Sequence, residues 1–163
     1  MARALLVGCG CRGRELGRRL LNDGWLVRGS TRSPERFPVL EEAGIEPMLA
    51  DPDRPGSILD QVGDVTVVCW LLGSARGEED LLRAIHGARL ERLLGKLVDS
   101  PVRGFLYEAS GDGEPDRLAA GAAIVQAAAA RWRIPVEVLE HDPDEWRGWT
   151  AAAHAGVRRL VGR

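Results

Sequence analysis

The sequence predicts an α/β fold in which six strands form one doubly wound parallel sheet between two layers of helices. Strand-like apolar runs and helix-like segments alternate along the whole chain. Helical crossovers between strands imply parallel pairing with right-handed connections, so we expect a three-layer α/β/α arrangement with the strand order 3-2-1-4-5-6. A length of 163 residues, of which 45% are apolar and 28% charged, indicates a single globular domain over residues 1–163.

The first strand–helix–strand unit starts near the N-terminus. Residues 4–7 are a short apolar run that ends in glycine, as expected of a strand buried on both faces. Leucines recur at helical spacing over 14–22, and Gly24 follows as a stop signal. A second short strand is therefore expected over 25–29.

The next unit contains one strand and two helices. A helix is expected over 34–43, because Pro34 suits the first helical position and Ser33 suits the N-cap. The third strand follows over 45–50, and a short helix is expected over 57–62.

The middle of the chain supplies the central strand. Residues 65–72 (VTVVCWLL) are the most apolar run and predict the fourth strand. Apolar residues at helical spacing then predict one long amphipathic helix over 78–97. Residues 104–109 predict the fifth strand.

The last part of the chain alternates in the same way. An alanine-rich helix is expected over 117–132, a sixth strand over 136–140, and a final helix over 143–160 with Asp142 as its cap. Residues 110–116 are expected to form a loop after the fifth strand. Ligands bind beyond the carboxyl ends of the strands in such sheets, so this loop should lie at the binding edge.

A G-x-G-x-x-G motif lies between the first strand and the first helix. Gly8 permits a tight turn, Gly10 lets the backbone approach a pyrophosphate, and Gly13 lets the helix pack closely on the strand. Free N–H groups and the helix dipole would then favour phosphates, as in a Rossmann fold. The alternative is a glycine-rich turn that binds nothing. The residues expected to contact a dinucleotide at this loop and beside it are Gly8, Gly10, Cys11, Arg12, Gly13 and Leu71.

The end of the second strand favours NADP over NAD. It carries Ser30, Thr31 and Arg32, which offer hydroxyl groups and a guanidinium but no carboxylate. A guanidinium pairs well with a 2′-phosphate, which an acidic residue would repel. Arg32 could instead be an exposed loop arginine. Asp51 could hold the adenine amino group, or could be a turn residue together with Asp53.

Composition and cysteine usage restrict the other classes of ligand. The net charge of −2 gives no electrostatic reason to expect nucleic acid or an anionic membrane as a partner. Three free cysteines and the lack of a leader-like N-terminus predict a cytoplasmic protein. Cys9 and Cys11 lack the further ligands of a zinc site, and the histidines are dispersed, so no metal is expected.

Residues 8–53 resemble the N-terminal segment of the atypical short-chain dehydrogenase/reductases, in the subgroup with a G-x-G-x-x-G loop. The likeness becomes looser toward His141, and it implies a Rossmann core that binds NAD(P). The positions that it carries over are Gly8, Gly10 and Gly13 for the pyrophosphate, Thr31 and Arg32 after the second strand, Asp51 for the adenine, and Ser110 after the fifth strand.

The chain departs from that family where catalysis is concerned. Classical members use a Tyr-x-x-x-Lys pair on the helix after the fifth strand, in which the lysine lowers the pKa of the tyrosine. Here residues 117–132 contain neither type, Tyr107 is the only tyrosine, and Lys96 is the only lysine. Extended relatives also continue beyond the sixth strand, so we expect most of the substrate region to be missing.

Two other residues are candidates for catalysis. Ser110 could bind a substrate carbonyl or could be an ordinary turn serine. His141 could act as a general acid beside Asp142, or could be a surface histidine next to a helix cap. Trp146 and Trp149 are three residues apart, and we expect them to share a face that lines a pocket or packs the last helix.

These observations leave two functions open. One is an NADP-dependent oxidoreductase for a small-molecule substrate, with an unusual proton donor or a partner chain that completes the site. The other is a non-catalytic redox sensor or regulatory module that binds the dinucleotide, with a homodimer as its reporting assembly. A module that gates ion transport fits less well, because the second strand of such modules usually ends in an acid, where this chain has Arg32.

Overall fold

The computed structural model describes residues 1–162 and contains one sheet of six parallel strands. The strands lie in the order β3-β2-β1-β4-β5-β6, which confirms the predicted doubly wound fold. Each strand pairs in parallel with its neighbours, and β1 lies between β2 and β4. The strands are β1 (Arg3–Val7), β2 (Leu26–Thr31), β3 (Glu46–Leu49), β4 (Val67–Trp70), β5 (Gly104–Glu108) and β6 (Val136–Leu139).

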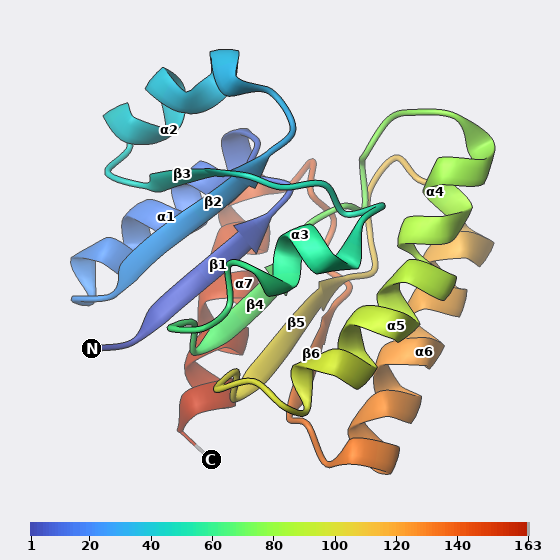
Figure 1. The fold of residues 1–163 in the computed structure, drawn as a ribbon. Coiled ribbons are helices and arrows are strands. Elements are labelled where there is room, and N and C mark those ends of the chain that lie inside the picture. Colours follow the sequence, from blue (N-terminus) through green and yellow to red (C-terminus); the bar gives the residue numbers. More distant parts are fainter. Residues whose placement is uncertain (163) are drawn as a thin grey trace.

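Helices cover both faces of the sheet. On one face the core joins α1, α2 and α7, and on the other it joins α3, α5 and α6. Figure 1 shows α3 and α5 in front of the sheet and α1 and α7 behind it. The helices are α1 (Cys11–Asn22), α2 (Phe37–Glu42), α3 (Pro55–Leu59), α4 (Glu79–Ile85), α5 (Ala88–Leu97), α6 (Pro115–Trp132) and α7 (Trp146–Val161).

The central strands are buried on both faces, as their continuous apolar runs predict. In β1, Ala4 and Leu6 face the core of α1 and α7, whereas Leu5 and Val7 face the core of α3, α5 and α6. The same alternation in β5 turns Tyr107 toward α5 and α6. Glu108 comes next in the strand and turns the other way, toward α7.

The prediction of one helix over 78–97 is wrong. This segment forms two helices, α4 and α5, which are separated at His86 and Gly87. A side chain at Gly87 would place its Cβ 2.7 Å from the carbonyl oxygen of Arg83. His86 is buried at the break and hydrogen-bonds to Tyr107 and to the backbone of Leu72. The apolar spacing alone favours one continuous helix, but the tertiary contacts of His86 favour the interruption between α4 and α5.

Other helix starts also differ from the sequence prediction. Residues 34–43 contain a short 3-10 helix, η1 (Pro34–Arg36), before α2, and Ser33 makes no capping hydrogen bond to the backbone. Helix α3 covers 55–59 rather than 57–62. Asp142 does not cap α7, because its carboxylate accepts from the backbone N–H of Asp144 in a local turn and the helix begins only at Trp146.

The two tryptophans of α7 do not share one environment. Trp149 is buried in the core against the sheet, whereas Trp146 is half exposed and lies at the first position of the helix. The guanidinium of Arg147 lies over the Trp146 ring, 5.3 Å from its centroid. Of these two tryptophans, only Trp149 packs the last helix on the sheet.

Candidate functional site: an arginine-lined pocket at the glycine turn

The turn after β1 has the backbone geometry that its glycines predict. Gly8 has a φ of 89°, a left-handed conformation that glycine adopts without strain. A Cβ at Gly8 would lie 2.3 Å from the carbonyl oxygen of Leu71, so the turn also packs directly on the chain that follows β4. By contrast, a Cβ at Gly10 would meet nothing within 4 Å. The chain thus leaves open space in front of the Gly10 backbone.

Helix α1 begins directly behind this space. Its first internal hydrogen bond runs from the N–H of Arg14 to the carbonyl oxygen of Gly10. The helix itself therefore supplies no acceptor for the N–H groups of Cys11, Arg12 and Gly13. Gly13 lies close to the turn, because its Cβ would be 3.3 Å from the Gly8 carbonyl oxygen. This arrangement suits an anion at the helix N-terminus.

A pocket of about 850 Å³ lies over this turn, at the carboxyl ends of the strands. It contains nine of the ten residues that sequence analysis proposes for the dinucleotide, Asp51 being the exception. The described residues that line it are Gly8, Cys9, Gly10, Cys11, Arg12, Gly13, Ser30, Thr31, Arg32, Arg36, Ala50, Pro52, Leu71, Leu72, Ser74, Ala75, Arg76, Glu108 and Trp149.

The lining of the pocket is strongly basic, although the chain as a whole has a net charge of −2. Four arginines line it, and Glu108 is the one acidic residue among the described lining residues. Arg32 and Arg36 come from the segment after β2, Arg12 from α1, and Arg76 from the segment after β4. Such a lining suits a ligand with several negative charges.

The β2 end of the pocket brings together the residues expected to recognise a 2′-phosphate. Ser30 is buried at the end of β2, and Arg32 and Arg36 are exposed side chains at the pocket wall. The hydroxyl of Thr31 is used locally, since it accepts from the N–H of Ser33 at 3.1 Å. The two guanidiniums are therefore the main cationic groups at this end.

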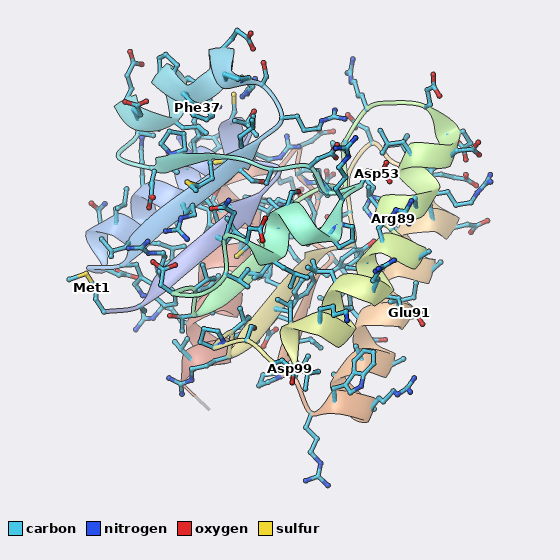
Figure 2. All side chains as sticks on the ribbon, viewed as in Figure 1. Met1, Phe37, Asp53, Arg89, Glu91 and Asp99 are labelled. Atoms are coloured by element: carbon cyan, nitrogen blue, oxygen red, sulfur yellow. The ribbon has the colours of Figure 1, made fainter. Side chains whose placement is uncertain are left out.

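The segment after β3 forms the far wall of the same end. Ala50 and Pro52 line the pocket, whereas the Asp51 carboxylate accepts from the N–H of Asp53 at 2.9 Å. This is the turn role that the sequence left open for Asp51. The carboxylate of Asp53 pairs with the Arg89 guanidinium of α5 at 3.2 Å, and Figure 2 shows these two side chains beside each other.

Glu108 lies at the opposite end of the pocket, where β5 finishes. One carboxylate oxygen accepts from the backbone N–H of Gly73, and the other from the indole N–H of Trp149, both at 2.8 Å. The residue as a whole is only 2% exposed. Burial raises its pKa, and the two hydrogen bonds and the nearby Arg12 guanidinium partly offset that rise.

The side chain of Arg12 reaches toward Glu108 rather than toward β2. One guanidinium nitrogen lies 3.5 Å from the hydroxyl oxygen of Ser74. The guanidinium also lies over the Trp149 ring, 6.0 Å from its centroid. Arg12, Ser74, Glu108 and Trp149 thus form a compact polar group at the β4–β5 end of the pocket.

Ser110 and His141 come together in space but do not line this pocket. The Ser110 hydroxyl donates to the backbone carbonyl of His141 and so ties the loop after β5 to the loop after β6. The imidazole Nε2 of His141 lies 3.6 Å from the Glu145 carboxylate. A catalytic role for these two residues stays a prediction.

The tyrosine and lysine of the chain lie away from the glycine turn. The Tyr107 side chain is fully buried, and its hydroxyl is 2.6 Å from His86 Nδ1. Burial raises the pKa of this phenol above its usual range. Lys96 lines a separate groove between α5 and α6.

The cysteines behave as ordinary side chains of the core and surface. Burial raises the pKa of both Cys9 and Cys69 to about 12, so these thiols stay protonated. Cys11 is exposed at the start of α1. Within residues 1–162 there is no group of three or more His, Cys, Asp or Glu side chains placed to hold a metal ion. Over the same residues, no helix is both long and apolar enough to cross a membrane.

Sequence reasoning missed several residues of the pocket. Glu108 had a detectable signal, because it is a charged residue at the carboxyl end of an otherwise apolar, doubly buried strand. Arg36, Ser74 and Arg76 had none, since each lies in a segment whose path over the pocket depends on the fold. The sequence predicts that Trp149 lines a pocket or packs the last helix, and in the structure it does both.

A scan against protein-family models and a search of curated proteins found no match to this sequence. Solved structures do match. A short-chain dehydrogenase/reductase superfamily protein from Agrobacterium tumefaciens with bound NAD is 19% identical, with a TM-score of 0.66 over 85% of this chain and 48% of that one. A mutant of UDP-glucuronic acid 4-epimerase from Bacillus cereus, solved with UDP-4-deoxy-4-fluoro-glucuronic acid and NAD, is 14% identical, with a TM-score of 0.65 over 83% of this chain and 55% of that one.

BdcA from E. coli matches over a larger share of both chains. The TM-score is 0.72 at 16% identity, over 98% of this chain and 93% of that one. By contrast, the chain spans about half the length of several other matched structures, from 48 to 56%. These likenesses establish a Rossmann-type fold shared with dehydrogenase/reductase- and epimerase-type proteins.

Proposed function

We propose that this protein binds NADP(H) in the arginine-lined pocket and acts as an oxidoreductase. The observation that carries the proposal is the combination of an open glycine turn at the N-terminus of α1 with Arg32 and Arg36 in the same pocket. The space in front of Gly10 suits a pyrophosphate, whose charge the α1 N–H groups would bind. Two of the matched structures were solved with NAD, which supports a nicotinamide dinucleotide as the ligand.

The lining of the pocket supports one direction for the bound dinucleotide. Its β2–β3 end, with Ser30, Arg32 and Pro52, would hold the adenosine half, and its β4–β5 end the nicotinamide half, as the two mononucleotide units of such a sheet require. Leu71 and Leu72 lie between the two ends. When bound, the nicotinamide supplies hydride transfer to or from a substrate carbon.

The choice of NADP rests on the charges after β2. Arg32 and Arg36 both line the pocket there, and Asp51, the nearest acidic residue of the next segment, points its carboxylate into its own turn. Guanidinium groups form strong paired hydrogen bonds with phosphate. We therefore expect the 2′-phosphate to bind between these two arginines.

The test is the thermal stability of the protein with NADPH, NADP⁺, NADH and NAD⁺ in turn. A ligand present at about 100 times its Kd stabilises the folded state by about 2.7 kcal/mol, which is readily measured. We expect stabilisation by NADP(H), and the Arg32→Ala and Arg36→Ala variants should lose most of it while keeping the weaker response to NADH.

Arg18→Ala is the matched control, because Arg18 is exposed on α1 and pairs only with Glu15 of its own helix. This variant should keep the full response. If no dinucleotide stabilises the wild-type protein, the proposal is wrong. If NADH binds as tightly as NADPH, the assignment of the 2′-phosphate to Arg32 and Arg36 is wrong. Dinucleotide binding without hydride transfer to any carbonyl compound would favour the redox-sensor alternative.

A further inference from the structure

We propose that the β4–β5 end of the pocket is a subsite for a small hydroxylated anion, in which the Arg12 guanidinium binds the anionic group and Glu108 accepts the proton of the alcohol. This inference rests on the proposed NADP(H) function, because the subsite adjoins the place assigned to the nicotinamide. The subsite consists of the polar group Arg12, Ser74, Glu108 and Trp149, and Arg76 lines the same pocket in the segment after β4.

The four arginines of the pocket fall into two sets. Arg32 and Arg36 follow β2, at the end assigned to the 2′-phosphate, whereas Arg76 follows β4. Arg12 belongs to the glycine turn by its backbone, but its guanidinium lies near Ser74 and the Trp149 ring. Its side chain is therefore directed away from the 2′-phosphate end. A second anionic group at the β4 side would account for this second set of charges.

Glu108 keeps acceptor capacity that its protein partners do not fill. A carboxylate offers about four lone-pair positions, and each Glu108 oxygen uses one of its two for Gly73 or Trp149. The group lines the pocket although it is 2% exposed, so an alcohol in the pocket could donate to it. Burial raises the pKa of this carboxyl, which makes it a better proton acceptor than an ordinary surface glutamate.

Trp149 and Gly73 act as positioning groups for this carboxylate. Their N–H groups hold both oxygens and come from α7 and from the segment after β4. Glutamine at position 108 would set its amide NH₂ against one of these donors, so Glu108→Gln removes the base and also loses one hydrogen bond. Aspartate keeps two acceptors and is the conservative variant.

The proposed step conserves atoms and electrons. The hydroxyl proton of the bound anion would pass to the Glu108 carboxylate, the carbon that bears this hydroxyl would give up its hydrogen as hydride to a bound oxidised nicotinamide, and the C–O single bond would become a carbonyl. Glu108 then returns its proton to solvent. In the reverse direction, protonated Glu108 donates to the carbonyl oxygen as the hydride arrives. Hydroxycarboxylates and phosphorylated alcohols both have the required chemistry.

The test uses the full-length protein saturated with NADP⁺, to which small probes are added. The probes are glycolate and malate as hydroxycarboxylates, glycerol phosphate as a phosphorylated alcohol, and ethylene glycol and glycerol as uncharged alcohols. We expect a further thermal stabilisation by one charged class and none by the uncharged alcohols. Arg12→Gln should weaken this second binding about tenfold or more, and it should lower the affinity for NADPH less than Arg32→Ala does.

Hydride transfer gives the second readout. With the stabilising probe as substrate, the rate should rise with pH through the pKa of Glu108 in the wild-type protein, and Glu108→Asp should keep a shifted profile. Glu108→Gln should abolish turnover while still binding the probe. A merely structural role would lower stability without moving the pH profile. Arg18→Gln, on the same helix as Arg12 but outside the pocket, is the control.

Two results would overturn the subsite. One is a dinucleotide complex that no charged probe stabilises. The other is a loss of NADPH affinity in Arg12→Gln as large as in Arg32→Ala, which would assign the Arg12 guanidinium to the dinucleotide. Failure of the proposed function looks different, because no dinucleotide would then bind. In that case the charged probes are titrated into the protein alone, and the subsite fails too unless they bind in an Arg12-dependent way.

Discussion

Gly8 and Gly10 are close in the chain but are needed for different reasons. Gly8 is required by the fold, since its φ of 89° and the nearby Leu71 carbonyl exclude a Cβ. Gly10 has an ordinary negative φ and open space in front of it, so the fold tolerates a methyl group there. A Cβ at Gly10 would instead occupy the space proposed for the pyrophosphate.

This contrast predicts opposite outcomes for two alanine substitutions. Gly8→Ala should lower the free energy of unfolding by more than about 2 kcal/mol, because it adds a left-handed alanine and a backbone clash. Gly10→Ala should cost less than about 1 kcal/mol at this N-cap position but should abolish stabilisation by NADPH. Urea denaturation and thermal shift separate the two. Undiminished NADPH binding by Gly10→Ala would contradict the placement of the phosphates.

Helices α4 and α5 are joined at a buried histidine that also contacts the sheet. The carbonyl of Leu72 can only accept, so His86 Nε2 carries the proton at 3.0 Å and Nδ1 accepts from the Tyr107 hydroxyl at 2.6 Å. The neutral imidazole therefore satisfies both contacts. Burial lowers the pKa of His86, because the charged form loses its hydration.

Acid should therefore weaken the packing at the junction of α4 and α5 and lower the stability of the protein. Because the pKa of His86 is lower in the folded state, the unfolded chain binds more protons below its own pKa of about 6.5. The free energy of unfolding should therefore fall as the pH drops below that value, and the loss ends once the pH is below the folded pKa. Denaturant titrations across this range measure the slope.

His86→Gln is the matched variant for that slope. A glutamine side chain can donate to the Leu72 carbonyl and accept from the Tyr107 hydroxyl, but it does not titrate. The acid-dependent loss should shrink in this variant. An unchanged slope would mean that groups other than His86 cause the pH dependence.

At the scale of the whole molecule, the charge distribution matters more than the total. The chain carries a net charge of −2, yet four arginines and one buried carboxylate line the pocket. This local field should attract a polyanion and should weaken as salt screens it. Salt should therefore weaken the binding of the more negatively charged dinucleotide, NADPH, more than the binding of NADH.

Salt dependence therefore distinguishes the two reduced cofactors. Raising NaCl from about 50 mM to about 500 mM should raise the Kd of NADPH by a larger factor than the Kd of NADH. Isothermal titration at both salt concentrations measures this ratio, and Arg32→Ala should reduce the difference. Equal salt dependence for both cofactors would mean that the 2′-phosphate does not bind between Arg32 and Arg36.

The sequence by itself determined the architecture and one half of the candidate site. Apolar runs separated by amphipathic segments admit few arrangements other than a parallel, helix-covered sheet, and the strand order 3-2-1-4-5-6 followed from that. The glycine turn and the residues after β2 were also foreseeable, because a local turn and a strand end are set by nearby residues. Their lining of one pocket agrees with this expectation, and their binding role stays a proposal.

Only the tertiary structure decided the break between α4 and α5 and the β4–β5 end of the candidate site. The break between α4 and α5 depends on His86 meeting Tyr107 across the core, and no local pattern encodes that contact. Glu108 is a candidate site residue because it lines the pocket, where Gly73 and Trp149, 35 and 41 positions away, converge on its carboxylate. Ser110 and His141 form a hydrogen bond with each other, but neither residue lines the pocket. Local sequence sets the conformation of a segment, whereas the partners of a buried polar group are chosen by packing between distant segments.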